Sequence, residues 1–431
     1  MWMMLVCVLA VLFWLRGALY RRLVVFPKEE REWNALRAGR KEVAPLPGWR
    51  EFRGMLHSHS ELSHDSEVPF PAILQAMKES RTDFICMSDH CVEGKADFSW
   101  QWRGLHEGRL FIPGFEMKEG LMPFGVAGDV VLGNGMDGSE IARKTVEHGG
   151  VLFYAHPEEP RVWERSELTG MEIYNIHADT KDEGNVYVKL LPDVLVSQGR
   201  YPEHVFRLFF DRPVANLRHW DEMNQTRHLT GIAGNDCHQN NGVRGIYTAA
   251  GTLRVEDTSP KTIKEFKLNA VTRWLAGACF GPLTAGRQLF GFQLDPYARM
   301  GRFVGTHVLS RELTEPAILD SLRAGRAFVG FDLLVDSAGF EWWAEHAGGN
   351  GGGEVVVMGE SVANAADLRL RARSPVSCRF TVVKDGQVMT QKDGVDLEYT
   401  PVGPGRYRVE AELTIRDVLT PWVYTNPIWV K

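Results

Sequence analysis

Short apolar runs alternate with longer amphipathic stretches over the central part of the chain, from about Phe52 to Phe331. The apolar runs cover residues 84–87, 110–112, 130–132, 151–154, 171–174 and 231–233. Helix-like stretches lie between and after them, and the clearest ones run from Ser139 to His148 and from Glu315 to Ala324, each followed by glycine. Strands that alternate with helices are typical of an α/β protein with a parallel sheet, either open or closed into a barrel.

Side chains that can bind a metal ion follow five of these apolar runs. They are His90, Glu116, His156, His177 and the pair Asp236 and His238. In barrels and in open α/β sheets, the C-terminal ends of the strands form one rim. We therefore expect these residues to converge in space, although they are far apart in the sequence.

The densest group of such residues is the segment LHSHSELSHDS, from Leu56 to Ser66. His57 and His59 are two residues apart, so on an extended strand both imidazoles point to the same side and can bind one ion. Asp65 follows on the loop that leaves this strand. A single His-x-His pair is more often a pair of surface or core histidines, but its combination with the other strand-end residues favours a metal site.

The expected ligands are imidazoles and carboxylates without a thiolate, a set that suits Zn, Mn or Fe. More ligands are available than one ion uses, so we expect two or three divalent ions. Such ions can share a bridging hydroxide and clamp the attacking and leaving oxygens of an ester under hydrolysis. Glu116 is the candidate for a shared carboxylate and for a catalytic role together with Asp236. Asp89 is a third candidate for a catalytic role, in which it is expected to support the site rather than to bind metal.

These motifs resemble those of the PHP (polymerase and histidinol phosphatase) metal-dependent hydrolases, and their order and spacing match from about Arg53 to Tyr247. The C-terminal part, which ends in the tract 421–427, resembles the CehA/McbA-like branch, named for carbaryl hydrolase. The resemblance implies a distorted (β/α)7 barrel in which Glu116 bridges two ions. The metal-binding residues that it implies are His57, His59 and Asp236 for one ion, Glu116 and His156 for a second, and Asp65, His90 and His238 for a third.

One further ligand is implied less directly. Trinuclear relatives supply another imidazole near the position of His177, but the local sequence differs here. His177 is therefore either a metal ligand or a residue of the surrounding loop.

A different pattern begins after the glycine-rich segment 348–353. Residues 368–373 and 407–413 alternate between polar and apolar with a period of two, and turn sequences lie between them. Short strands at this spacing predict an Ig-like β-sandwich over residues 354–431, behind a metal-binding barrel over residues 46–345. The sandwich either braces the barrel or binds a partner.

The N-terminal segment is strongly apolar. Residues 1–15 carry no charge, and basic residues such as Arg16 and Arg21 follow. The apolar stretch to Tyr20 approaches the roughly 20 residues that cross a bilayer, so residues 1–26 are predicted to be a membrane anchor, with a signal peptide as the alternative. Because basic flanks tend to stay in the cytoplasm, the anchored barrel is expected to face the cytoplasm, with an exported form as the alternative.

The overall composition is that of a globular protein, with 44% hydrophobic and 24% charged residues among 431. The chain has 49 Lys and Arg against 55 Asp and Glu, a net charge of −6, which argues against a nucleic-acid partner. Its six cysteines form no CxxC pair, which argues against a disulfide scaffold and against a cysteine zinc site.

Together these observations predict a membrane-associated hydrolase that cleaves a small phosphoester. A carbamate or carboxylic ester is the alternative substrate for the same site, and a non-catalytic, membrane-tethered binding protein is a third possibility that the intact ligand set disfavours. The candidate cations for a phosphate are Arg103, Lys118 and Arg244, and the candidate aromatic wall for an aryl ester is Trp100, Trp102 and Trp163. The sequence makes no prediction of the oligomeric state.

Overall fold

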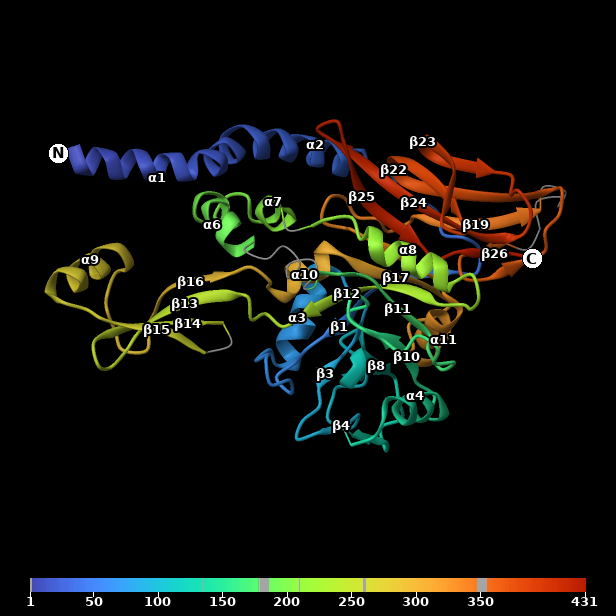
Figure 1. Ribbon diagram of the computed structural model, residues 1–431, viewed down its shortest axis with the longest axis horizontal. Coiled ribbons are helices and arrows are strands. Elements are labelled where there is room, and N and C mark those ends of the chain that lie inside the picture. The colour runs from blue at the N-terminus through green and yellow to red at the C-terminus, as the bar shows by residue number, and fades with distance from the viewer. Residues whose placement is uncertain are drawn as a thin grey trace.

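The chain is a mixed α/β protein built around one large sheet (Figure 1). The computed structural model describes residues 2–133, 135–176, 178, 186–208, 210–258, 261–346 and 355–431. The N-terminal helix lies along one side of the molecule, and the C-terminal strands gather at one end (Figure 1). At the other end, an arm of strands that carries one helix projects from the body (Figure 1).

The helices are short apart from those at the N-terminus. They are α1 (Trp2–Tyr20), the π-helical turn η1 (Arg21–Val25), α2 (Phe26–Gly39), α3 (Phe70–Ser80), the 3-10 turn η2 (Lys118–Gly120), α4 (Gly138–Glu147), α6 (Val186–Ser197), α7 (Pro202–Arg207), α8 (Val214–Met223), α9 (Ala270–Phe280), α10 (Tyr297–Phe303) and α11 (Glu315–Ala324). Helix α11 has the predicted range and ends at Gly325, which adopts the left-handed conformation of a C-cap. Helix α4 begins before the predicted Ser139, because Asp137 caps it by accepting a hydrogen bond from the Glu140 N–H at 2.8 Å.

Seven strands carry or adjoin the predicted metal-binding residues. They are β1 (Arg50–Ser58), β2 (Phe84–Cys86), β6 (Arg109–Ile112), β8 (Leu121–Phe124), β10 (Val151–Tyr154), β11 (Gly170–Asn175) and β12 (Thr230–Cys237). Strand β1 pairs in parallel with β2 and β12, β2 with β6, and β11 with β10 and β12. Strand β8 is antiparallel to β10, and it approaches β6 through a bridge between Gly114 and Phe124. The sheet is therefore not purely parallel, and the (β/α)7 barrel stays a prediction.

The C-terminal strands belong to the same large sheet. They are β19 (Glu341–His346), β20 (Val356–Val357), β21 (Ser361–Val362), β22 (Leu368–Lys384), β23 (Gln387–Tyr399), β24 (Gly405–Ile415), β25 (Val418–Thr425) and β26 (Ile428–Val430). Strand β1 pairs with β17 (Gly305–Ser310), β17 with β18 (Ala327–Gly330), and β18 with β25. One cluster of buried apolar side chains includes Met55 and Tyr154 near the rim and Trp342 and Trp422 among the C-terminal strands. The predicted division at residues 345 and 354 is thus bridged by hydrogen bonds and by the core, and a separate Ig-like sandwich stays a prediction.

Short strand pairs complete the rim. Strand β3 (Asp89–His90) pairs in parallel with β7 (Phe115–Glu116), β4 (Lys95–Asp97) pairs with β9 (Val131–Gly133), and β5 (Gly104–His106) pairs with β6. The pairing of β3 with β7 places His90 directly beside Glu116.

The projecting arm was not predicted from the sequence. It consists of β13 (Gly242–Tyr247), β14 (Thr252–Asp257), β15 (Thr262–Lys267), α9 and β16 (Gln288–Gln293), and its strands form an antiparallel sheet in the order β15-β14-β13-β16. The arm interrupts the predicted range 46–345, since it is inserted between β12 and α10.

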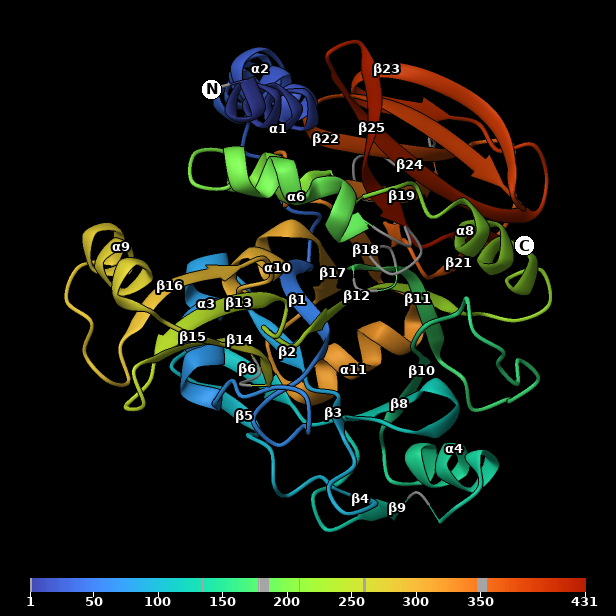
Figure 2. The ribbon, with the colours of Figure 1, turned by 60° about the vertical axis from the view of Figure 1, so that its left-hand side comes forward.

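The apolar N-terminal segment forms α1, which packs against α6 and leads through η1 into α2 (Figure 2). Arg21 pairs with the buried Asp193 of α6, and Phe26 and Trp33 are fully buried. Within the described residues, no helix is both long and apolar enough to cross a membrane. The membrane anchor over residues 1–26 stays a prediction.

Candidate metal centre

The C-terminal ends of β1 and β12 meet at a β-bulge. The bulge sets two residues of β12, Asn235 and Asp236, opposite His57 of β1. The buried Asn235 side chain replaces ladder hydrogen bonds, since it accepts from the Leu56 N–H at 3.3 Å and donates to Val304 O at 2.8 Å. Bulges redirect side chains, and here Asp236 Oδ1 lies 3.2 Å from His57 Nε2.

Imidazole and carboxylate atoms form three overlapping groups at this rim, and the ligand atoms of each group lie within 4.8 Å of one another. The groups are His57, His59 and Asp236; His57, Glu116 and His156; and His59, Asp65, His90 and His238. Their members come from the ends of β1, β10 and β12, from β3 and β7, and from the loop after β1. These clusters could bind several metal ions.

Two carboxylates lie between the first and second groups. Asp236 directs Oδ1 to His57 Nε2 and Oδ2 to His156 Nε2, at 3.2 and 3.5 Å. Glu116 directs Oε2 to His57 Nε2 at 3.3 Å and Oε1 to His156 Nε2 at 3.5 Å. The sequence suggested a bridging position for Glu116 alone, whereas in the structure Asp236 has the same disposition.

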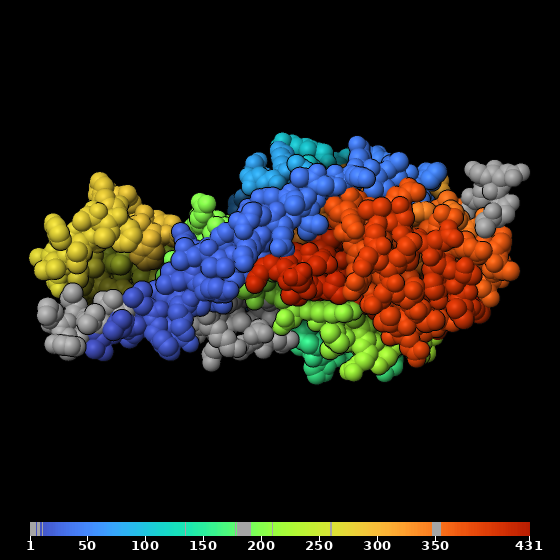
Figure 3. All heavy atoms as spheres, turned by 90° about the horizontal axis from the view of Figure 1, so that it is seen from above, coloured from blue at the N-terminus to red at the C-terminus, as the bar shows by residue number. Residues whose placement is uncertain are grey.

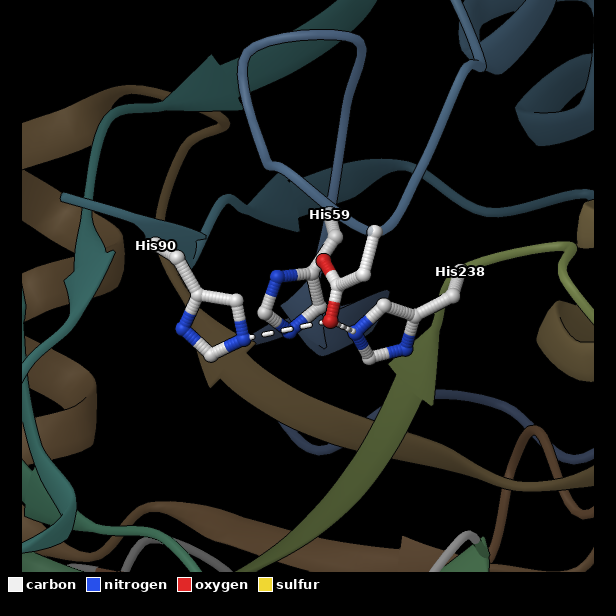
Figure 4. A group of neighbouring side chains, drawn as sticks. His59, His90 and His238 are labelled. Atoms are coloured by element: carbon white, nitrogen blue, oxygen red, sulfur yellow. Dashed lines mark ion pairs between the residues drawn. The ribbon is translucent and has the colours of Figure 1, made fainter. Parts of the chain in front are cut away.

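The third group lies beside them, and its three histidines point toward one another (Figure 4). Asp65 Oδ2 lies 3.4 Å from His90 Nε2 and 3.2 Å from His238 Nε2. The His59 and His238 rings stack with their centroids 3.9 Å apart. The loop that carries Asp65 is held in place by Ser63, whose Oγ lies 2.9 Å from His59 Nδ1 and accepts a hydrogen bond from the His90 N–H.

Unpartnered buried atoms show that these residues fit a divalent ion. His59 Nε2 and Asp65 Oδ1 are buried, and neither has a hydrogen-bond partner among the residues that the structure describes. Burial lowers the pKa of His59 to about 3, so its ring is neutral and offers a lone pair. A buried acceptor without a partner is unfavourable by about 1–3 kcal/mol, and a bound cation would remove this penalty.

The electrostatics of the site also favour a cation. Burial alone would raise the pKa of Glu116, but the charge of the His57 imidazole and its hydrogen bond lower it to about 2. Burial alone would lower the pKa of His156, but Glu158 and the other nearby carboxylates raise it to about 9. Ionised carboxylates thus draw positive charge to the imidazoles, either as protons or as metal ions.

Glu172, in the middle of β11, positions two of these histidines. Its Oε1 lies 2.6 Å from His57 Nδ1, and its Oε2 accepts hydrogen bonds from the His156 N–H and from Asn175 Nδ2, at 2.9 and 2.8 Å. A Cβ atom on Gly234 would lie 2.0 Å from Glu172 Oε1, so only glycine fits there. In the sequence, Glu172 falls within an apolar run that predicts a strand. The missed signal was a carboxylate within a buried run, because a buried charge requires partners.

Asp89 is buried and belongs to none of the three groups. It accepts hydrogen bonds from the Ser60 N–H and Oγ–H, at 2.5 and 2.9 Å, and from Gln101 Nε2 at 2.6 Å. Burial raises the pKa of Asp89 to about 6 in spite of these hydrogen bonds. Asp89 therefore holds Ser60, the residue that follows His59, in place.

Three candidate ligands have a left-handed backbone. The φ angles are 64° at His57, 48° at His156 and 48° at Asp236. This conformation is uncommon for residues other than glycine, and such strain tends to gather at functional sites.

The other predicted site residues are placed differently or not described. His177 lies outside the described residues. Arg103 pairs with Glu315, and Arg244 pairs with Glu256 at 2.7 Å. These two cations are thus engaged with carboxylates of the chain itself.

The three candidate tryptophans and Lys118 differ in their surroundings. Trp102 stacks on Phe70, and Trp163 packs edge-on against Tyr154. Trp100 is exposed, and Lys118 is half-buried in the turn η2.

Comparison with known proteins adds little to this picture. No protein-family profile matches the chain. No curated protein matches it either. A solved structure from Bacteroides vulgatus ATCC 8482, described as a two-domain protein containing a predicted PHP-like metal-dependent phosphoesterase, is 14% identical. The match covers 90% of this chain and 98% of that chain with a TM-score of 0.37, a likeness too low to carry an argument.

Proposed function

We propose that this chain is a metal-dependent hydrolase whose substrate is a small phosphoester. The observation that supports the proposal most is the disposition of Asp236 and Glu116, since each directs its two oxygens to different imidazoles. Carboxylates in this position can bridge adjacent ions, and adjacent ions suit the displacement reactions of phosphoesters.

The residues of the chain would divide into ligands and groups that orient them. When bound, adjacent divalent ions supply Lewis acidity and lower the pKa of a shared water toward about 7. Glu172 would keep His57 Nε2 directed into the site by holding Nδ1. The proposed ligands are His57, His59 and Asp236 for one ion, Glu116 and His156 for a second, and Asp65, His90 and His238 for a third.

The choice of a phosphoester rests on the resemblance of the sequence motifs to PHP hydrolases and on the number of ligand groups. Arg103 and Arg244 are paired with carboxylates, so bound ions rather than these side chains would balance the charge of a phosphoryl group. An aryl carbamate or carboxylic ester would gain from an aromatic wall. Trp102 and Trp163 instead pack against Phe70 and Tyr154 of the protein itself.

A substrate panel tests the proposal directly. Full-length protein loaded with Zn or Mn would be assayed against aryl phosphomonoesters, phosphodiesters, carboxylic esters and carbamates, each with and without chelator. We expect turnover of phosphoesters that the chelator abolishes. Chelator-sensitive turnover of the carbonyl substrates alone would reject the phosphoester but keep the hydrolase. Absence of turnover in fully metallated protein would contradict the catalytic proposal.

A further inference from the structure

The projecting arm carries an unpartnered apolar helix. None of the residues of α9 is buried. Val271, Trp274 and Leu275 lie three and four positions apart, so they share one helix face, and Val271 and Trp274 are 65% and 71% exposed. An exposed apolar face of this kind normally marks a contact surface.

Basic side chains are frequent in the arm that carries this face. The arm, residues 242–293, contains seven Lys and Arg against three Asp and Glu, whereas the whole chain has a net charge of −6. Among the residues that the structure describes, no ion pair involves Lys261, Lys264, Lys267 or Arg273. The arm therefore combines an apolar tip with uncompensated positive charge.

A second apolar surface lies at the same end of the molecule. The exposed side chains of α1 include Leu9, Phe13 and Trp14, and Phe13 is 65% exposed. Figures 1 and 3 both place the free end of α1 and the arm at one end of the long axis, opposite the C-terminal strands. Two elements far apart in the sequence thus carry exposed apolar side chains at the same end of the molecule.

We propose that α1 and the arm form one face that docks on the surface of an anionic lipid bilayer. Helices that lie in the bilayer interface combine an apolar face bearing Trp or Phe with Lys and Arg, which is the pattern of α9 and its flanks. A symmetric contact between two arms would bring like charges together, which disfavours a second copy of the chain as the occupant. Anionic head groups complement the same charges.

The base of the arm is hydrogen-bonded to a residue beside the metal centre. The buried Asp295 accepts hydrogen bonds from the backbone N–H groups of Asn240 and Asn241, at 3.2 and 3.0 Å. Asn240 also donates through its side chain to Asp65 O at 3.0 Å. Because only a few residues separate His238 from β13, docking of the arm would hold the metal centre at a set distance from the lipid surface.

Vesicle binding by the full-length protein tests this proposal. The protein would be sedimented with phosphatidylcholine vesicles with and without about 30% phosphatidylserine, at about 0.1 M and 0.5 M salt. Every variant keeps α1 unchanged, so that only the contribution of the arm is tested. The triple variant Val271→Ser, Trp274→Ser, Leu275→Ser removes the apolar face of α9. The double variant Lys264→Glu, Lys267→Glu reverses two of the arm's positive charges. The matched control is Val388→Ser, Val402→Ser, Val418→Ser, which alters equally exposed valines among the C-terminal strands.

We expect the wild type to bind anionic vesicles in a salt-sensitive manner. Both arm variants should bind these vesicles at least about ten-fold more weakly than the wild type. The control variant should bind like the wild type. Circular dichroism and metal content, unchanged in each variant, would show that the fold is kept. Equal binding by the wild type and the arm variants would overturn the proposal, as would a lipid-independent dimer that the triple variant dissociates in analytical ultracentrifugation.

Discussion

Asp236 is the residue on which the proposed centre depends most. It belongs to the group with His57 and His59, and it also faces His156 of the neighbouring group. Asp236→Asn replaces a charged ligand oxygen with an amide nitrogen or a neutral oxygen. We expect the variant to lose at least one metal equivalent and most of its activity, measured by elemental analysis and by the substrate panel. His148→Ala, which alters an exposed histidine after α4, should change neither quantity. Full metal content in Asp236→Asn would contradict the assignment.

Glu172 should affect metal binding without being a ligand itself. Glu172→Gln cannot keep the three contacts that the carboxylate makes, so the ring of His57 loses its orientation. Loss of such a supporting group typically weakens metal affinity about 10–100-fold. Competition with a metal indicator would measure this loss, and Glu164→Gln, at an exposed position, is the control. Equal affinities in the two variants would exclude the positioning role.

At the level of residues, the sequence identified the members of the three groups better than the residues that support them. His57, His156 and Asp236 follow apolar runs, so strand ends could be recognised and their convergence expected. Glu172 lies inside such a run, and its function depends on a neighbour 115 positions away. A contact over that distance has no local pattern.

Strands β1 and β17 are joined by a buried histidine whose charge depends on pH. His307 Nδ1 lies 2.6 Å from Glu51 Oε1, and its Nε2 lies 2.9 Å from Asp332 Oδ2, which is also 3.0 Å from Arg53 Nε. Burial alone would lower the pKa of His307, but Asp332 and Glu51 raise it to about 9. An unfolded histidine titrates near pH ~6.5, so the folded chain keeps a proton that the unfolded chain loses above that pH.

The stabilisation by His307 should therefore be fully present below pH ~6.5 and disappear as the pH rises through about 9. We expect the free energy of unfolding of the wild type to fall by about 3 kcal/mol across this window relative to His307→Gln. Urea denaturation at several pH values would measure the difference, with His148→Gln as the control. The same pH dependence in wild type and His307→Gln would show that this contact contributes no such stabilisation.

Among the elements, agreement between sequence and structure follows the strength of local signals. Helix α11 has both an amphipathic pattern and a glycine stop, and its range was predicted. Strand β8 was not anticipated as an antiparallel neighbour of β10, because direction depends on the path of the chain between strands. The arm strands β13–β16 pair mainly with one another away from the body, and they lack the continuous apolar runs from which the other strands were recognised.

At the level of the whole molecule, Asn426 connects the C-terminal strands to the rim sheet. Its side chain accepts from the Gly231 N–H at 2.8 Å and donates to Gly231 O and Ala327 O, at 3.0 and 2.8 Å. Asn426→Ala would remove these three side-chain hydrogen bonds to buried backbone groups, although Ala327 O keeps the one that it accepts from the backbone N–H of residue 426 at 3.1 Å. We expect a loss of about 2–3 kcal/mol in the free energy of unfolding. Urea denaturation should still show one transition, because the sheet and the core are continuous. A separate early transition of the C-terminal strands would contradict the continuity of the sheet and the core. Asn364→Ala, at an exposed position, is the control.

The predicted boundary near residues 345–354 rested on the glycine-rich segment and on the alternation with a period of two that follows it. This β-rich pattern is present in the structure as β22 and β24. The sequence could not show that β25 pairs with β18, because a pairing between strands so far apart in the sequence leaves no pattern in either segment. The glycine-rich segment itself lies outside the described residues.

The left-handed backbone at His57, His156 and Asp236 has a consequence for protein engineering. Each side chain at such a position costs about 1–2 kcal/mol, whereas glycine adopts the conformation freely. Glycine would relieve this strain, but at His57 it would also leave the buried Glu172 Oε1 without its partner. Directed evolution for heat resistance alone would therefore act against a proposed ligand wherever the relieved strain exceeds the contacts that are lost, so each round of selection should also demand activity.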